Sequence, residues 1–245
     1  MTTTEFESNH TNEEPRQTNK IARRSAFAAV GGLAAAALVT AGSSTVSGQT
    51  RVPTRAGASV GKAPRQAAPP EGDLTIGALA ASLEVLAVST YQAALDAAGS
   101  GALGAVPPAV AEYVTTARDQ HQEHLDAWNG VLAAAGKPRV SAPPADLAKM
   151  VNDQFARVTT VVGAAQLALW LEQVAADTYL FAIKALESPE AITLAGSIFP
   201  IDRQHQSILL FVLGMYPVPQ VFANTDMAYT GTGSLPPGAT APESR

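Results

Sequence analysis

The sequence contains no cysteine, which excludes disulfides, thiolate nucleophiles and iron–sulfur clusters. It is also poor in aromatic residues, at 6% of 245, and in charged residues, at 15% where about 25% is usual. The formal net charge of -5 provides no attraction to nucleic acid, and we expect no such partner. The hydrophobic fraction of 47% is mainly alanine, valine and leucine, which favours closely packed helices. Any metal site has to use histidine and carboxylate ligands.

Residues 1–41 have the arrangement of an export signal. A polar stretch is followed by the pair Arg23 and Arg24 and then by an uncharged run, rich in Ala and Gly, from Ser25 to Gly42. The pair resembles a twin-arginine signal, although the phenylalanine after it lies one position later than usual, and small residues permit cleavage after Ala41. We expect export to the periplasm, cell envelope or extracellular space. Because Ala and Gly are weakly hydrophobic, we expect no stable membrane span in the mature form.

The remaining chain divides by composition into three parts. Residues 42–72 are rich in Gly, Ser, Pro and Thr and show no helical or strand periodicity, which predicts a disordered linker. Residues 73–216 show helical periodicity and are expected to form one domain. Residues 217–245 are predicted to be an extended C-terminal segment that ends in a disordered tail.

Four helical patterns occupy the predicted domain. The pair Pro107–Pro108 suits a first helical turn, and Gly136 is expected to end the helix that follows it. A short separate helix up to Met150 is an alternative within the third pattern, and Pro200 is expected to kink or restart the fourth. Because strand signals are scarce, the chain is predicted to be all-α and to form a four-helix bundle. The helices are expected over about residues 74–96, 107–135, 144–186 and 189–213.

Two carboxylates interrupt apolar helix faces. Glu84 is flanked at helical spacing by alanine, valine and tyrosine side chains, and Glu172 is placed in the same way among alanine, leucine and tyrosine. Burying an isolated ionised carboxylate costs several kcal/mol. Each glutamate therefore needs a metal, another cation or a proton as its partner.

These glutamates belong to an internal repeat. The segment Leu83–Tyr91 recurs as Leu171–Tyr179, with Leu, Glu, Ala, Thr and Tyr at matching places, and Gln120–Gln122 recurs as Gln204–Gln206. The bundle is therefore expected to consist of two duplicated helical hairpins. Three of the four histidines are expected on the second and fourth helices where these face the glutamates: His121, His124 and His205.

With these spacings, residues 74–214 resemble the ferritin-like superfamily, and specifically its small exported ferritin-like domain proteins. That resemblance implies a dimetal site with one Glu from each of two helices and a Glu-x-x-His pair from each of the other two. It implies that Glu84 and Glu172 are the single glutamates. It also implies that Asp202 and His205 form one of the pairs, with Asp in place of Glu.

The second helix departs from the family pattern. If the internal repeat sets its register, His121 matches the ligand histidine and Arg118 occupies the position of the missing carboxylate. If the register shifts by one turn, His121 and His124 form a His-x-x-His pair. Oxygen and imidazole donors without sulfur suit Fe, Mn or Zn, and the resemblance favours one or two ions of Fe or Mn. The implied ligands are Glu84, Glu172, Asp202 and His205, with one or both of His121 and His124.

These patterns support two functions. Following the resemblance, the first is redox chemistry with oxygen or peroxide by a ferroxidase-like or oxidoreductase-like enzyme. In the second, Arg118 points inward, pairs with Glu84 or Asp202 and replaces the metal, which leaves a degenerate site in a non-catalytic structural or interaction domain of the cell envelope. Tyr91 and Tyr179 are expected either to pack in the core with bonded hydroxyls or to lie beside the metal.

Overall fold

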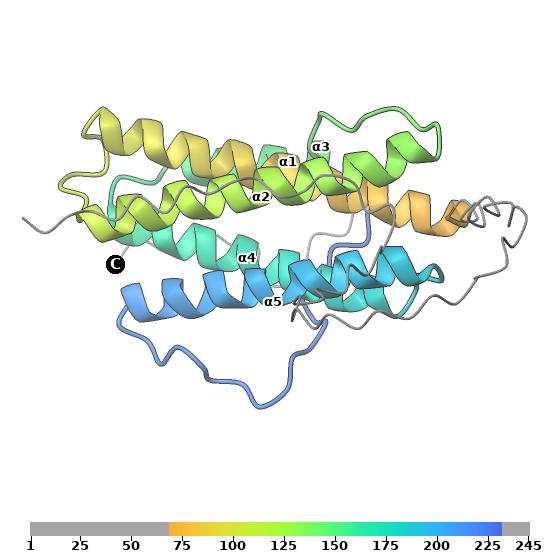
Figure 1. Ribbon diagram of the computed structural model, residues 1–245. Helices are drawn as coiled ribbons and strands as arrows, with labels where there is room; N and C mark the ends of the chain where they lie inside the picture. Colours follow the sequence, from red (N-terminus) through yellow and green to blue (C-terminus); the bar gives the residue numbers. More distant parts are fainter. Residues whose placement is uncertain (1–68, 232–245) are drawn as a thin grey trace, which may run out of the picture. The chain divides into compact units, whose positions relative to one another are not determined.

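The computed structural model describes residues 69–231, and within this range it contains five helices and no strand (Figure 1). The prediction of an all-α chain is confirmed. The predicted signal over residues 1–41, almost all of the predicted linker and the end of the predicted tail lie outside the described residues. The helices are α1 (Glu71–Gly99), α2 (Pro108–Ala134), α3 (Ala145–Phe155), α4 (Val161–Ile183) and α5 (Pro189–Val212).

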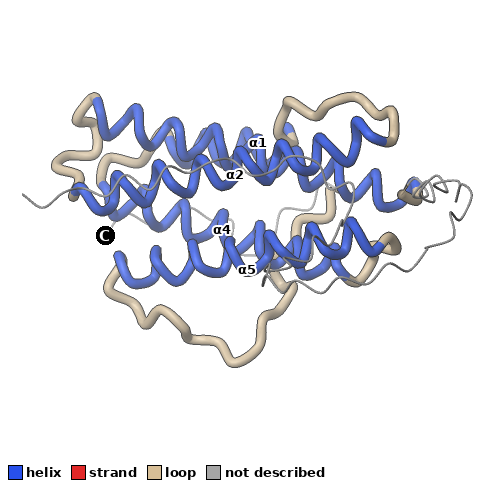
Figure 2. Tube along the Cα trace, viewed as in Figure 1, coloured by secondary structure: helices blue, strands red, loops and turns tan. Residues whose placement is uncertain are grey.

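The four long helices form two hairpins, as the internal repeat predicts. Helix α1 packs chiefly against α2, and α4 packs chiefly against α5 (Figure 2). The short helix α3 lies in the long connection between the hairpins and packs against α4. A bundle with one such crossover between its hairpins is the arrangement of ferritin-like folds, and the predicted four-helix bundle is confirmed.

The third predicted helix is two helices in the structure. The chain leaves the helical conformation after Phe155 and enters it again at Val161, so the alternative break at Met150 is placed too early. Thr160 causes the restart because its backbone is extended and its hydroxyl accepts a hydrogen bond from the Gly163 N–H across 3.0 Å. No glycine or proline lies in the break, and Thr160, a residue type favoured at helix N-caps, is the local signal of the restart.

Helix α5 continues through Pro200, so the predicted restart at this residue is wrong. A proline inside a helix removes the hydrogen bond to the carbonyl four residues earlier, here that of Gly196. Both residues are exposed, so the freed carbonyl lies on the solvent side of the bundle. The packing of the inner face of α5 holds the helix in one piece.

Two apolar clusters form the core. The larger surrounds Trp128 of α2, which is fully buried, and Gly77 of α1 permits this packing because a Cβ there would lie 3.0 Å from the indole ring. The smaller places Leu147 and Val151 of α3 against Val174 of α4. Helix α3 therefore covers one side of the bundle with its apolar face.

The segment after α5 returns to the bundle. The Met227 N–H donates to Asp177 across 3.0 Å, and the Tyr229 N–H donates to Thr178 across 2.8 Å. The Tyr229 ring is buried, and its hydroxyl donates to Asp146 at the start of α3 across 2.7 Å. Part of the predicted extended C-terminal segment is thus a strap that joins α3 to α4.

By length and composition alone, α1 is the one described helix that would suffice to cross a membrane. Core helices of folded bundles meet the same criteria. In the structure, α1 packs against α2 and buries the carboxylate of Glu84 and the ring of Tyr91. It therefore occupies the position of a core helix.

Candidate metal centre

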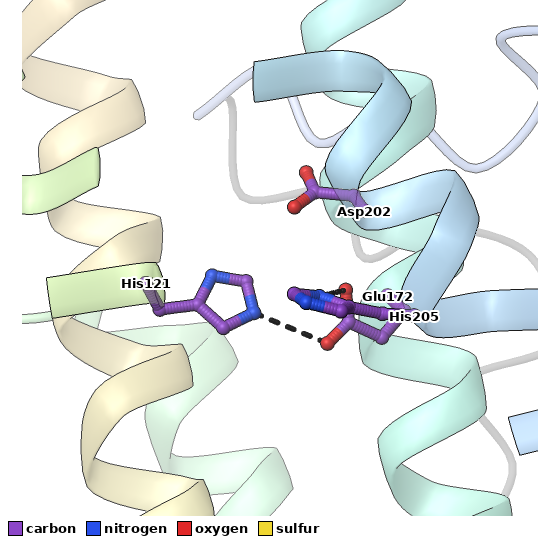
Figure 3. A group of neighbouring side chains, drawn as sticks. All are labelled: His121, Glu172, Asp202 and His205. Atoms are coloured by element: carbon purple, nitrogen blue, oxygen red, sulfur yellow. Dashed lines mark hydrogen bonds and ion pairs between the residues drawn. The ribbon is translucent and has the colours of Figure 1, made fainter. Parts of the chain in front are cut away.

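All six predicted ligands meet in the interior of the bundle, and they come from α1, α2, α4 and α5. They form two overlapping groups that share His121, and within each group ligand atoms lie within 4.8 Å of one another. Five of the side chains are buried, and His124 is half-buried. The first group, shown in Figure 3, is His121, Glu172, Asp202 and His205, and the second is Glu84, His121 and His124.

Glu84 is held by both histidines of α2 and by a tyrosine. Its Oε2 lies 2.7 Å from Nδ1 of His121, and its Oε1 lies 3.6 Å from Nδ1 of His124. The Tyr179 hydroxyl donates to Oε1 across 2.6 Å. His121 and His124 therefore lie on the same inner face of α2, and both are close to Glu84.

Glu172 is held in a corresponding way from the other hairpin. Its Oε1 accepts a hydrogen bond from the Tyr91 hydroxyl across 2.5 Å and lies 3.1 Å from Nε2 of His121. Its Oε2 lies 3.3 Å from Nδ1 of His205 (Figure 3). The His121 imidazole therefore lies between the two glutamates, with one ring nitrogen facing each.

The charges of Glu84, His121 and Glu172 stabilise one another. Burial raises the pKa of Glu84 and Glu172, but the charges and hydrogen bonds of the neighbouring histidines, chiefly His121, together outweigh it, which lowers the pKa of Glu84 to about 2 and that of Glu172 well below its usual range. Burial also lowers the pKa of His121, but Glu172 and Glu84 outweigh it and raise that pKa well above its ordinary value. The two carboxylates are thus ionised, and a cationic group between them is favoured.

Two members of the cluster have buried polar atoms without hydrogen-bond partners: His124 at Nδ1 and Asp202 at both carboxyl oxygens. Asp202 is fully buried. Burial, together with repulsion from Glu172 and Glu84, raises the pKa of Asp202 well above its usual value. Buried polar atoms without partners are uncommon in folded proteins. A cation between Asp202 and its neighbours would satisfy these oxygens, so the residues present fit a metal ion.

The orientation of His205 also suits a ligand. Its Nε2 lies 2.7 Å from Oε1 of Gln120, so Nε2 carries the ring hydrogen and donates it. Nδ1 faces Oε2 of Glu172 across 3.3 Å. A hydrogen bond from the other ring nitrogen, here to Gln120, is how proteins orient a ligating histidine.

Arg118 does not enter the cluster. Its guanidinium donates to Gln92 of α1 across 2.9 Å and to Asp119 across 2.7 and 3.0 Å, at the solvent edge of the bundle. The predicted alternative, in which Arg118 pairs with Glu84 or Asp202 in place of a metal, is therefore wrong. Arg118 stands at the position that the internal repeat aligns with Asp202, but it reaches outward with its long side chain.

Two polar residues next to the cluster were missed in the sequence. Gln120 orients His205, and Tyr113 lies 3.1 Å from the Tyr91 hydroxyl, oxygen to oxygen. Both share the inner side of α2 with His121, and Gln120 also belongs to the repeated Gln-His-Gln segment, which was a usable signal. The hydroxyls of Tyr91 and Tyr179 are bonded, as predicted for core tyrosines, and their partners are the cluster glutamates.

Comparison with known proteins identifies one family. A family model described as a ferritin-like domain matches residues 72–215, which is more than half of the chain. No match is found among curated proteins or among solved structures. The matched range begins with α1 and ends just after α5, so it spans both hairpins and every residue of the cluster.

Proposed function

The chain belongs to the ferritin-like domain family, and on that premise we propose that its buried cluster binds one or two ions of iron or manganese. The observation that carries this proposal is the pair of unpartnered oxygens on Asp202, a fully buried side chain. An apolar side chain at this position would avoid the cost of an unsatisfied buried carboxyl group. A bound cation would instead offset that cost, because it supplies the missing partner of the carboxyl oxygens.

The main metal position is the group of His121, Glu172, Asp202 and His205, which offers two carboxylates and two imidazoles. Glu84 and His124 offer a second position on the other side of His121. A donor set of oxygen and imidazole nitrogen suits iron and manganese. The missing carboxylate at Arg118 makes the second position poorer in negative charge than its family counterpart.

We propose that the loaded centre performs redox chemistry with oxygen or peroxide. A bound iron or manganese ion would supply one-electron transfer to such a substrate. The contribution of the chain is to hold the ligands in a dry interior: Tyr91 and Tyr179 fix the two glutamates, and Gln120 fixes His205.

The decisive variant is Asp202→Asn. Because neither oxygen of Asp202 has a hydrogen-bond partner, the near-isosteric amide should leave the metal-free fold intact. The same change removes one of four ligands at the main position. After anaerobic reconstitution with Fe(II) or Mn(II), we expect the wild-type protein to hold about one or two equivalents and the variant to hold far less.

The matched control is Asp119→Asn, because this aspartate is exposed on the same bundle and pairs with Arg118 at the surface. Its metal content should equal that of the wild type. A chelator should lower the melting temperature of the wild type and of the control but not that of Asp202→Asn. Equal metal content in Asp202→Asn and wild type, or none in the wild type after reconstitution, contradicts the proposal.

We also propose that the protein is exported, on the strength of the signal-like sequence of residues 1–41 alone. The intact mass of the exported form should correspond to a chain that begins after Ala41. Replacing Arg23 and Arg24 with lysine should retain the uncleaved protein inside the cell. Export of the lysine variant at the wild-type level would exclude the twin-arginine route.

A further inference from the structure

A pocket runs through the bundle from the cluster to one end of the helices. It lies mainly between α1, α2 and α4, with Leu147 and Phe155 of α3 and Leu209 and Val212 of α5 completing its lining, and its volume is about 80 Å³. At its inner end it is lined by Tyr91, His121 and Glu172. At its outer end it reaches Val106, beyond the end of α1, and Val161, at the start of α4.

The walls of this pocket are almost entirely aliphatic. Alanine, valine and leucine side chains from α1, α2 and α4 make up most of them, including Ala94 and Ala164. The polar side chains among its lining are those beside the cluster and Thr90, whose hydroxyl already donates to the Leu86 carbonyl across 2.8 Å. A molecule in the outer part of the pocket therefore finds hardly any hydrogen-bonding group.

The size and polarity of the pocket select its occupant. A water molecule needs roughly 10–15 Å³ and two to four polar partners, and apolar cavities of about 150 Å³ stay dry yet bind benzene or xenon. At about 80 Å³, the pocket has room for a molecule of a few non-hydrogen atoms, but it offers few partners to a polar one. Hydrogen peroxide would lose its hydrogen bonds to water in this passage, whereas dioxygen has none to lose.

We propose that the pocket is the access route and holding site for a small apolar molecule of the size of dioxygen, which it delivers to the Tyr91, His121 and Glu172 side of the cluster. This inference rests on the proposed function, because it names which oxidant reaches the centre. Glu84 and Asp202 do not line the pocket among the described residues, so delivery is to one side of the cluster only. Polar peroxide has to arrive by another path.

Xenon is the direct probe, since it is apolar and its binding needs no metal. In methyl NMR spectra of the full chain under xenon pressure, saturable shifts are expected at alanine, valine and leucine methyl groups that line the pocket. Ala94 and Ala164 line the pocket, so the larger side chains of Ala94→Leu and Ala164→Leu should each fill part of it. Each variant should weaken xenon binding by about tenfold, which is about 1.4 kcal/mol of binding free energy, because the added side-chain atoms occupy the space that xenon would fill.

Ala133→Leu is the matched control, because Ala133 is exposed on α2 and does not line the pocket. Two leucine variants at different places keep the test valid if one of them fails to fold, which backbone NMR spectra would show. Unchanged xenon binding in a folded pocket variant, or the absence of xenon shifts in the wild type, overturns the proposal.

A second measurement separates the oxidants. In iron-loaded protein, each pair of ferrous ions oxidised to ferric ions gives up two electrons, which with two protons reduce one dioxygen to hydrogen peroxide or one hydrogen peroxide to two water molecules. The pocket variants should slow this reaction with oxygen by about tenfold but leave it within about twofold with peroxide. An equal loss with both oxidants contradicts delivery through the pocket. Xenon binding without any metal uptake would refute the proposed function and the delivery of oxygen to a metal, while metal uptake without xenon binding would refute the pocket alone.

Discussion

Tyr91 of α1 donates its hydroxyl hydrogen to Glu172 of α4 across 2.5 Å, from one hairpin of the bundle to the other. The repeat makes this contact reciprocal, since Tyr179 of α4 donates to Glu84 of α1 across 2.6 Å. Within each repeated segment the tyrosine follows its glutamate by two helical turns, yet it bonds the glutamate of the opposite segment. The two repeated segments are therefore joined at the cluster by a pair of equivalent hydrogen bonds, each from the tyrosine of one segment to the glutamate of the other.

The first prediction concerns Tyr179, which links the core to the cluster because it accepts from the Trp128 indole across 2.9 Å and donates to Glu84. Tyr179→Phe removes both bonds and leaves two buried polar groups with fewer partners. We expect a loss of about 1–3 kcal/mol in the free energy of unfolding, measured by urea denaturation of the metal-free protein. Tyr216→Phe is the control, because that ring is 70% exposed. A loss no larger than that of the control would show that these two bonds contribute little to stability.

The second prediction concerns Gln120, which accepts the Nε2 hydrogen of His205 across 2.7 Å. Gln120→Ala frees the ring to rotate and to exchange its tautomer, so Mn(II) affinity measured by calorimetry should fall by about 10–100-fold. Gln120→Glu keeps an acceptor in place and should retain most of the affinity. Gln204→Ala provides a matched control, since Gln204 occupies the equivalent position of the repeat but is exposed. Similar affinities for the two alanine variants would disprove the orienting role of Gln120.

The third prediction concerns Asp73, a buried residue in the first turn of α1. Its carboxylate accepts hydrogen bonds from the backbone N–H groups of Glu187 and Ser188 across 2.9 and 2.8 Å, just before α5 begins. Burial raises the pKa of Asp73, but these backbone donors and the Ser188 hydroxyl outweigh it, so the pKa lies below its ordinary value. The carboxylate therefore joins the two hairpins in its ionised form.

Because the folded-state pKa of Asp73 is depressed, its stabilising effect should be present in full above the unfolded-state pKa of about 3.9 and disappear as the pH falls through the folded-state pKa. Asp73→Asn should reduce the free energy of unfolding by about 1–3 kcal/mol near pH 7 and by much less in strong acid. Urea denaturation over this pH range measures the difference. Asp96→Asn, on the exposed side of α1, should show no such dependence. A constant difference at all pH values would exclude ionisation of Asp73 as its cause.

Much of the cluster was predictable from local pattern. Glu84 and Glu172 stand on apolar helix faces, and an ionised group at such a position needs a partner wherever the other helices lie. The Gln-His-Gln repeat placed His121 and His205 on facing helices, because duplicated hairpins bring equivalent positions together. The break before Thr160 was not predicted at its true place, since a single cap residue decided it against a run of helix-compatible side chains.

By itself, the sequence determined the helical hairpins, their duplication and the inward faces of the glutamates and histidines, because these follow from the 3.6-residue period of each helix. Only the tertiary structure decided which other side chains they contact. Arg118 lies one turn before His121, so the period alone allowed it to face inward, but contact with Gln92 takes its guanidinium to the solvent edge. Asp202 likewise became an unpartnered buried carboxyl group only when α5 packed against the rest of the bundle, since His121 and Glu172 beside it come from other helices.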